Sequence, residues 1–225
     1  MFGITKDTQD PSTSGPIPVG INENVKFNGA TFTPLKEGGE PTLQYHFEDS
    51  EGRELRTAIW KPTKERSAET IANAKNSGNP RVHKRTNKAL GFVKGEQITS
   101  DEMYTIDVQD FNAYNKHILN RFVNEETIVN AMTNVSSYED FANAVVKLCD
   151  NADLTPLVRL KVVYSYDYKY HELPKNHYNP FISLMTDANN LTITEWDRVS
   201  RPGVVDDAPE SFNVDALTTD DDLAF

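Results

Sequence analysis

Cysteine is almost absent from the sequence. Cys149 is the only one among 225 residues, so a disulfide within the chain and a multi-cysteine zinc site are both excluded. It closes an apolar stretch that is predicted to be helical, which favours a buried thiol over a nucleophilic one. Scarcity of cysteine is typical of a reducing compartment, so we predict a cytoplasmic protein.

Catalytic, cofactor-binding and membrane signatures are missing as well. The sequence has neither a phosphate loop of the Walker type nor a Gly-x-Ser-x-Gly elbow, and its five histidines have no spacing that suggests a shared metal ion. No apolar run approaches the roughly 20 residues of a membrane span, and residues 1–19 lack the apolar core of a signal peptide. We therefore predict a protein that is not an enzyme, has no metal or cofactor and does not enter a membrane.

Hydrophobic residues are few, at 37%, and they are unevenly distributed. Residues 1–18 are polar and without period, which predicts a flexible N-terminal arm. Residues 203–225 hold seven of the 34 acidic residues and no Lys or Arg, which predicts a disordered interaction tail. Without the tail the chain has 27 acids against 23 bases, a net charge of −4 in place of −11. Residues 19–202 remain as one mildly acidic domain, long enough for a sizeable core.

The first part of this domain alternates as β-strands do. A strand is predicted over residues 42–48, and a return strand over 53–60 follows a short turn. An earlier strand over residues 25–32 contains Gly29, which predicts a bulge or a sharp bend. Three strands joined by two hairpins suit the opening of an OB-fold barrel, and they would equally suit any antiparallel meander.

Trp60 ends the return strand on the face opposite to Leu55 and Ile59, and Arg56 shares its side. If the two aliphatic residues face the core, the indole faces outward. An outward indole beside a guanidinium is suited to stacking on nucleobases. The alternative is that a bulge turns Trp60 inward or that the following helix covers it.

Helices are predicted over residues 63–76 and, as three helices, within 107–149. The strands are therefore interrupted by a helical insertion at about residues 63–150. We assign the apolar stripes of these helices to core packing. Ser136 followed by Glu139 predicts a capping box at the start of the last helix.

A basic segment lies within this insertion, because no acidic residue occurs between Glu69 and Glu96. In an acidic protein such a segment is the expected place for phosphate contacts, and a solvated loop is the alternative. The cations of the basic segment are Lys75, Arg81, Lys84, Arg85, Lys88 and Lys94.

Alternation resumes over residues 157–170, which predicts one long strand that runs past the core into a hairpin. Its second half would project tyrosines, with Lys169 on the opposite face. Two more strands are predicted over residues 180–185 and 191–196. The tyrosines would serve self-association as readily as base stacking, so a homo-oligomer stays open. They are Tyr164, Tyr166, Tyr168 and Tyr170.

The tail ends on Asp220, Asp221, Asp222, Leu223, Ala224 and Phe225. Several Asp followed by a short apolar end with a terminal Phe resemble the C-terminal tip of bacterial and phage single-stranded-DNA-binding proteins. The resemblance implies a mainly β, α+β fold: an OB-fold-like antiparallel barrel with helices between its third and fourth strands. The chain departs from the bacterial members, whose OB domain is shorter, and from the zinc-containing phage type, whose cysteine and histidine cluster it lacks.

The same resemblance implies sequence-tolerant binding of single-stranded DNA in replication, recombination or repair, in the host cytoplasm if a phage encodes the protein. Bases would stack on Trp60 and on some of the four tyrosines. Arg56, Lys169 and the cations of the basic segment would hold the DNA backbone.

The tail would recruit replication proteins such as a polymerase, a helicase or a nuclease. Its partner-binding residues would be Asp220, Asp221, Asp222, Leu223 and Phe225. Two alternatives stay open: an interaction module of a replication complex that does not touch DNA, and a protein that binds RNA or duplex DNA.

Overall fold

The computed structural model describes residues 15–33, 41–76, 81–83, 85–90, 94–175 and 179–201. The predicted tail, most of the predicted N-terminal arm and Lys84 lie outside these residues. In chain order the elements are β1 (Gly20–Thr33), β2 (Thr42–Glu48), β3 (Glu54–Ile59), α1 (Lys64–Asn76), β4 (Arg81–Val82), β5 (Ala89–Leu90), α2 (Ser100–Leu119), α3 (Glu125–Met132), α4 (Tyr138–Asp150), β6 (Val158–Tyr164), β7 (His171–Glu172) and β8 (Ile182–Leu184).

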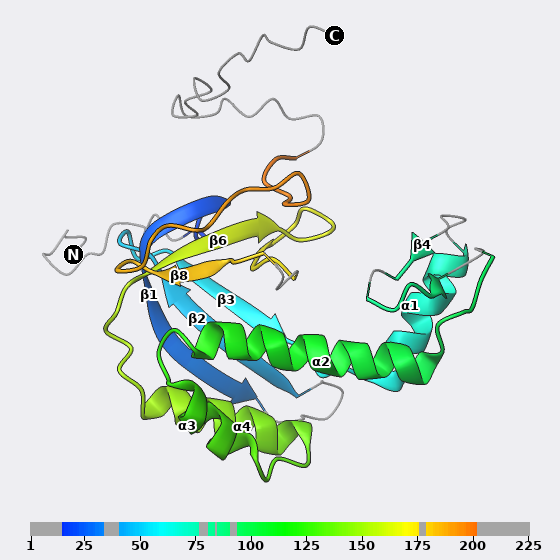
Figure 1. The fold of residues 1–225 in the computed structure, drawn as a ribbon. Coiled ribbons are helices and arrows are strands. Elements are labelled where there is room, and N and C mark those ends of the chain that lie inside the picture. Colours follow the sequence, from blue (N-terminus) through cyan, green and yellow to red (C-terminus); the bar gives the residue numbers. More distant parts are fainter. Residues whose placement is uncertain are drawn as a thin grey trace, which may run out of the picture.

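Six of the strands form a mostly antiparallel sheet that nearly closes into a barrel (Figure 1). The order is β3-β2-β1-β6-β7, and β8 pairs with the first half of β6, on the edge away from β1. Between the two end strands, β3 and β7, lies the segment before β1: Pro16 bridges to Glu54, and Ile17 is fully buried. The ring of His171 donates from Nδ1 to the Ile17 carbonyl at 2.7 Å. Residues 15–18, predicted as part of a flexible arm, are thus docked in the seam of the barrel.

The bend predicted in the first strand is present. Gly29 has a φ of +90°, a backbone conformation that other residues rarely adopt, and the register with β2 shifts between Phe27 and Ala30. The bend lets the 14-residue β1 pair with β6 through its first half and with β2 through its second. One strand thereby joins both parts of the barrel.

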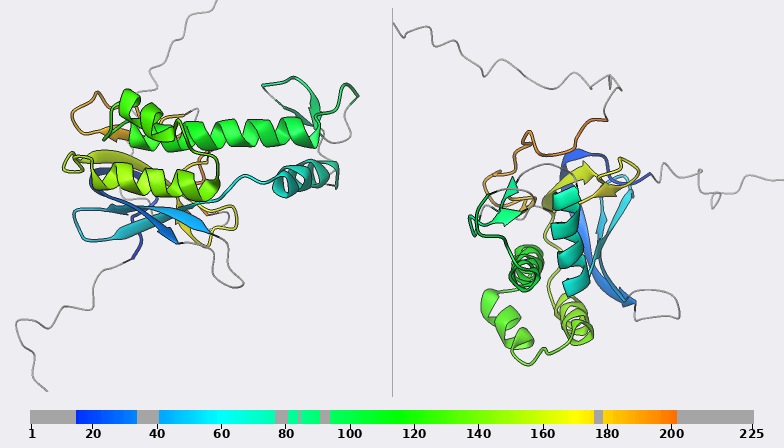
Figure 2. Two further views of the ribbon diagram at one scale, coloured as in Figure 1. Left: turned by 90° about the horizontal axis from the view of Figure 1, so that it is seen from below. Right: turned by 90° about the vertical axis from the view of Figure 1, so that its right-hand side faces the viewer.

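The core lies between the sheet and the helices. The alternation predicted for β2 is confirmed, because Leu43, Tyr45 and Phe47 are buried to 1% exposure or less. Phe27 stacks on Phe122 at 4.6 Å between ring centroids, which links β1 to the turn that follows α2. The predicted burial of Cys149 is also confirmed, and burial raises the pKa of its thiol to about 12. Figure 2 shows α2, α3 and α4 gathered on one side of β1, β2 and β3.

The helices begin at other residues than predicted in two places. α2 begins at Ser100 instead of residue 107, because Thr99 and Glu102 form a capping box. The predicted capping box of Ser136 and Glu139 is wrong: Ser137 caps α4 and accepts a hydrogen bond from the backbone N–H of Asp140 at 3.1 Å. α1 begins where predicted, after Thr63.

A projecting unit, which we call the arm, consists of α1, β4, β5 and the N-terminal half of α2. Figures 1 and 2 show it standing away from the barrel. It has a small core of its own, made of Ile71, Ala74, Leu90, Ile98, Met103 and Ile106. The other half of α2 contributes Ile118 and Leu119 to the barrel core, so this one helix belongs to both cores.

The long strand predicted over residues 157–170 is wrong, because β6 ends at Tyr164. The chain turns at once: the carbonyl of Tyr170 accepts from the backbone N–H of Ser165 at 2.7 Å, and Tyr168 has a φ of +58°. The carboxylate of Asp167 accepts from the Ser165 hydroxyl at 2.7 Å and stabilises this turn. Tyr166, Tyr168 and Tyr170 therefore belong to a turn and not to an extended face.

The strand predicted over residues 191–196 is also wrong. Residues 191–201 form an irregular strap that runs beside β6, and the backbone N–H of Tyr164 donates to the carbonyl of Arg198 at 2.8 Å. The strap covers the face of β6 that alternation left for solvent. As a result Lys161 is fully buried, and its ammonium contacts the Asp197 carboxylate at 2.9 Å and the Thr192 carbonyl at 3.0 Å.

Candidate nucleic-acid interface

A groove of about 500 Å³ lies where the barrel does not close, and we call it the seam groove. One wall is β3 from Arg56 onward together with the connection to α1, and the opposite wall is β7 with the turn that precedes it. The middle of α2 forms the floor through Asp107, Asp110 and Phe111. The groove thus joins the barrel to the base of the arm.

Trp60 lies at the end of β3 on a wall of the seam groove, half exposed at 50%. Leu55, Thr57 and Ile59 point into the core, so the indole faces outward as alternation predicts. Arg66 of α1 lies over the ring at 5.6 Å from its centroid and donates to the Lys61 carbonyl at 3.1 Å. A guanidinium on an indole face is a cation–π contact.

Sequence reasoning missed Arg66. Arg56, the residue expected beside the indole, lines the groove and pairs with Glu54 at 2.8 Å. Only the path of the chain from β3 into α1 reveals which arginine reaches the ring. A basic residue in the first turn of the predicted helix, six residues after Trp60, is the sole signal that the sequence offered.

The structure brings one of the four tyrosines to the groove. Tyr170 lines it and is 69% exposed, whereas Tyr166 points into solvent elsewhere on the turn. Tyr164 is half-buried between Tyr168 and His171, with the guanidinium of Arg201 over its ring at 5.0 Å. These contacts make Tyr164 a packing residue of the turn, and Tyr170 is the one of the four tyrosines that a ligand in the groove would meet.

Lys169 sits on the same turn, outside the groove. It is exposed and pairs with Asp167 at 3.1 Å. The hydrogen bonds that Asp167 accepts from Ser165 and Lys169 lower the pKa of this carboxyl to about 2. Lys169 therefore carries its charge next to a carboxylate that is ionised at neutral pH.

The floor of the groove is acidic but balanced by the arm. The Ser67 hydroxyl, itself fully buried, donates to Asp107, and burial raises the pKa of this carboxyl above its ordinary value. Arg85 reaches Asp110 at 2.5 Å and the side chain of Gln109 at 2.6 Å. Arg85 of the arm therefore neutralises the charge of Asp110 on the floor of the seam groove.

Comparisons with known proteins assign nothing to this arrangement. No family model, curated protein or solved structure matches the chain.

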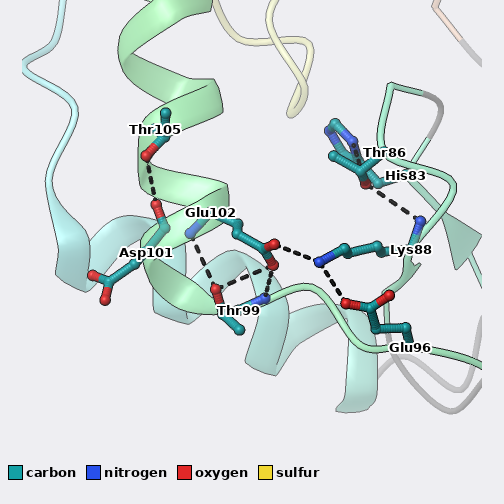
Figure 3. A network of polar contacts seen from close by, with 8 residues as sticks. All are labelled: His83, Thr86, Lys88, Glu96, Thr99, Asp101, Glu102 and Thr105. Atoms are coloured by element: carbon teal, nitrogen blue, oxygen red, sulfur yellow. Dashed lines mark hydrogen bonds and ion pairs between the residues drawn. The ribbon is translucent and has the colours of Figure 1, made fainter.

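The basic segment is not free of acids in three dimensions. Figure 3 shows Lys88 between two carboxylates, Glu96 at 2.7 Å and Glu102, which also caps α2 through Thr99. The contact with Lys88, together with the hydrogen bond from Thr99, lowers the pKa of Glu102 to about 2. Lys88 thereby fastens the β4–β5 hairpin to α2.

The other cations of the basic segment differ in their surroundings. Lys75 and Lys94 are exposed on the arm, Arg85 is paired as described, and Arg81 begins β4. Lys84, like the predicted partner-binding residues 220–225, falls outside the described residues.

Neither a membrane-spanning helix nor a cluster of metal-binding side chains occurs among the described residues. No helix among them is both long and apolar enough to cross a membrane. Within the same ranges, no three His, Cys, Asp or Glu side chains gather as the ligands of a metal ion would.

Proposed function

We propose that this protein binds single-stranded DNA with little sequence preference, and that the seam groove is the principal site. One observation carries the proposal. A half-exposed tryptophan with an arginine over its ring lies on the wall of a groove that also contains Tyr170. Aromatic platforms beside cations are how single-strand binders hold bases, at ~1–3 kcal/mol per stacked base.

Single strands suit the groove better than duplexes do. Stacking on Trp60 needs the flat face of a base, and a duplex keeps those faces stacked on one another. Every base has such a face, so binding of this kind tolerates sequence.

Charge in the groove supports contacts with the DNA backbone. Arg56, Lys61, Arg66 and Lys175 all line it. The pair of Arg56 with Glu54 is exposed, and Lys175 reaches Glu172 only at 3.5 Å. An exposed pair such as that of Arg56 with Glu54 contributes roughly 0–1 kcal/mol, so a phosphate can replace this carboxylate at small cost. Binding should therefore weaken steeply with salt.

The fold agrees with this assignment at the level of architecture. We interpret the barrel as OB-fold-like, because three strands joined by two hairpins are followed by a helical insertion before the next barrel strand, β6. The OB-fold places its helix in that connection. The proposed setting is DNA replication, recombination or repair in a cytoplasm.

Titration with oligo-dT tests the proposed function. Intrinsic tryptophan fluorescence is expected to fall and saturate, to respond more strongly to the single strand than to a duplex of equal length, and to recover as salt is added. An equal response to oligo-U would place RNA among the ligands. Absence of any binding at low salt would contradict the proposal and favour an interaction module that does not touch DNA.

The acidic tail has a separate proposed role, the recruitment of a polymerase, helicase or nuclease. Deleting residues 215–225 removes four of the seven acidic residues of the tail and the terminal Phe225. DNA affinity is expected to stay equal or become tighter, because negative charge is lost, while capture of the replication protein is abolished. Pull-down and oligo-dT titration of the same preparation measure both.

Phe225→Ala is the matched control, since it keeps all the charge of the tail. It is expected to weaken partner capture without changing DNA affinity. A truncated protein that binds oligo-dT more weakly than the full chain would contradict this role for the tail.

A further inference from the structure

Trp196 is the second of the two tryptophans in the chain, and it lies outside the seam groove. Its side chain is 74% exposed. It borders a separate hollow of about 180 Å³ together with Val163, Pro174, Lys175 and Arg198. Packing within the chain does not explain an indole that is left so far in water, because most of its apolar surface gains nothing from the fold.

The strap holds Trp196 firmly. The neighbouring Asp197 points inward, with its side chain 8% exposed, and binds the fully buried Lys161. The same carboxylate accepts hydrogen bonds from the backbone N–H of Thr194 at 2.8 Å and from the Thr194 hydroxyl at 3.0 Å. A ligand that stacks on Trp196 would therefore have little backbone disorder to remove, which favours binding.

The hollow beside Trp196 adjoins the seam groove. Lys175 lines both, and the guanidinium of Arg198 reaches Glu172 on the groove wall at 3.2 Å. A path over this surface meets Trp60, Tyr170, Lys175, Arg198 and Trp196. Aromatic rings occupy both ends of the path, and cations lie between them.

We propose that a single strand leaving the seam groove passes Lys175 and stacks a further base on Trp196. Arg198 and Lys175 hold the phosphates between the two indoles. This inference rests on the proposed function and extends it, since it makes the DNA site longer than the groove and gives it two aromatic stations.

The two tryptophans make the inference directly measurable. Trp60→Phe leaves Trp196 as the only indole, and Trp196→Phe leaves Trp60. Each variant is titrated with oligo-dT of increasing length, while the anisotropy of a fluorescein-labelled oligonucleotide reports binding independently. Trp60 emission is expected to fall with the shortest oligonucleotides that bind, and Trp196 emission only with longer ones.

Trp196→Ala adds a measurement of affinity. It is expected to lower the affinity for long oligo-dT at least fivefold and to leave the affinity for the shortest oligonucleotide that binds unchanged. Trp196→Phe keeps an aromatic face and should retain most of the affinity. The exposed position means that thermal unfolding should be unchanged in both variants, which separates a binding defect from a folding defect.

One result would contradict the Trp196 subsite alone, and another would contradict single-stranded-DNA binding itself. If anisotropy reports binding and Trp60 is quenched, but Trp196 emission is unchanged at every length, Trp196 is not a subsite and the proposed function stands. If neither indole responds and anisotropy shows no binding, the proposed function itself fails.

Discussion

Replacing Lys161 with alanine is expected to destabilise the protein by about 3–5 kcal/mol, because it leaves a buried carboxylate without its cation. Lys161 is fully buried and Asp197 nearly so, at 2.9 Å from each other. When one partner of a buried ion pair is removed, the desolvation free energy of the remaining charge is no longer compensated. The strap, which that pair fastens to β6, is expected to loosen first.

Lys169→Ala provides the matched control. It removes another Lys–Asp pair at 3.1 Å, but this pair is exposed on the turn after β6. Exposed pairs contribute roughly 0–1 kcal/mol, so the variant should unfold almost as the native protein does. Urea unfolding followed by circular dichroism compares the two. Equal losses from Lys161→Ala and Lys169→Ala would show that the buried pair does not stabilise the strap.

The effect of Lys161→Ala should depend on pH. Burial alone would raise the pKa of Asp197, but hydrogen bonds from Lys161 and Thr194 outweigh it, so the native pKa lies below the ordinary value of 3.8. Such a carboxyl contributes stability that is present above its unfolded-state pKa and is lost as the pH falls through the folded-state pKa. Without Lys161 burial prevails and the pKa rises. The stability gap between variant and native protein should therefore narrow as the pH falls toward about 4.

Trp60→Ala is expected to weaken binding of single-stranded DNA by roughly 5- to 150-fold, which corresponds to the ~1–3 kcal/mol of one stacked base. The indole is half exposed and borders the seam groove, so its removal takes away the platform without opening the core. Fluorescence anisotropy of labelled oligo-dT at low salt measures the change.

Trp60→Phe separates stacking from other causes. A phenyl ring keeps an aromatic face for a base, and this variant should retain most of the affinity. Thermal unfolding of both variants should match that of the native protein. An affinity of Trp60→Ala within twofold of the native value would mean that the DNA does not pass over this residue.

The strands that pack on one face only were the most predictable part of the fold. In β2 and β3 every second side chain faces the core and the others face solvent, so the alternation of apolar and polar residues in the sequence predicts the orientation of each side chain. The outward direction of Trp60 follows from this register. The bend at Gly29 was predictable for a related reason, because a glycine inside a strand has no packing role and usually serves the backbone.

The last third of the chain was less predictable, because β6 is covered on both faces. Alternation in β6 places Lys161 on the face opposite to the aliphatic residues, and such a face is normally exposed to solvent. Here the strap covers that face and buries it. Turns also escaped detection where side chains create them. Ser165 and Asp167 end β6 by hydrogen bonding, although the tyrosines around them continue the strand pattern.

The charge of the site could not be read from sequence spacing. A stretch of chain without acids predicted free cations, yet Lys88 and Arg85 meet carboxylates of α2 that come later in the sequence. Proximity of this kind depends on how α1, β4 and β5 fold back on α2. The same holds for Arg66 and Trp60, which meet only because the chain turns from β3 into α1.

The arm is inserted between β3 and β6, and β1 pairs with β6 across that insertion. The entropy of closing a loop grows only with the logarithm of its length, by about 0.6 kcal/mol for each doubling. Lengthening or shortening the arm, with its separate core, should thus change the stability of the barrel far less than altering one of its strands. The length and sequence of the arm can therefore vary, in evolution or by design, without a change in the barrel. Such variation would alter the residues around Trp60, while the barrel would continue to hold Trp60 in place.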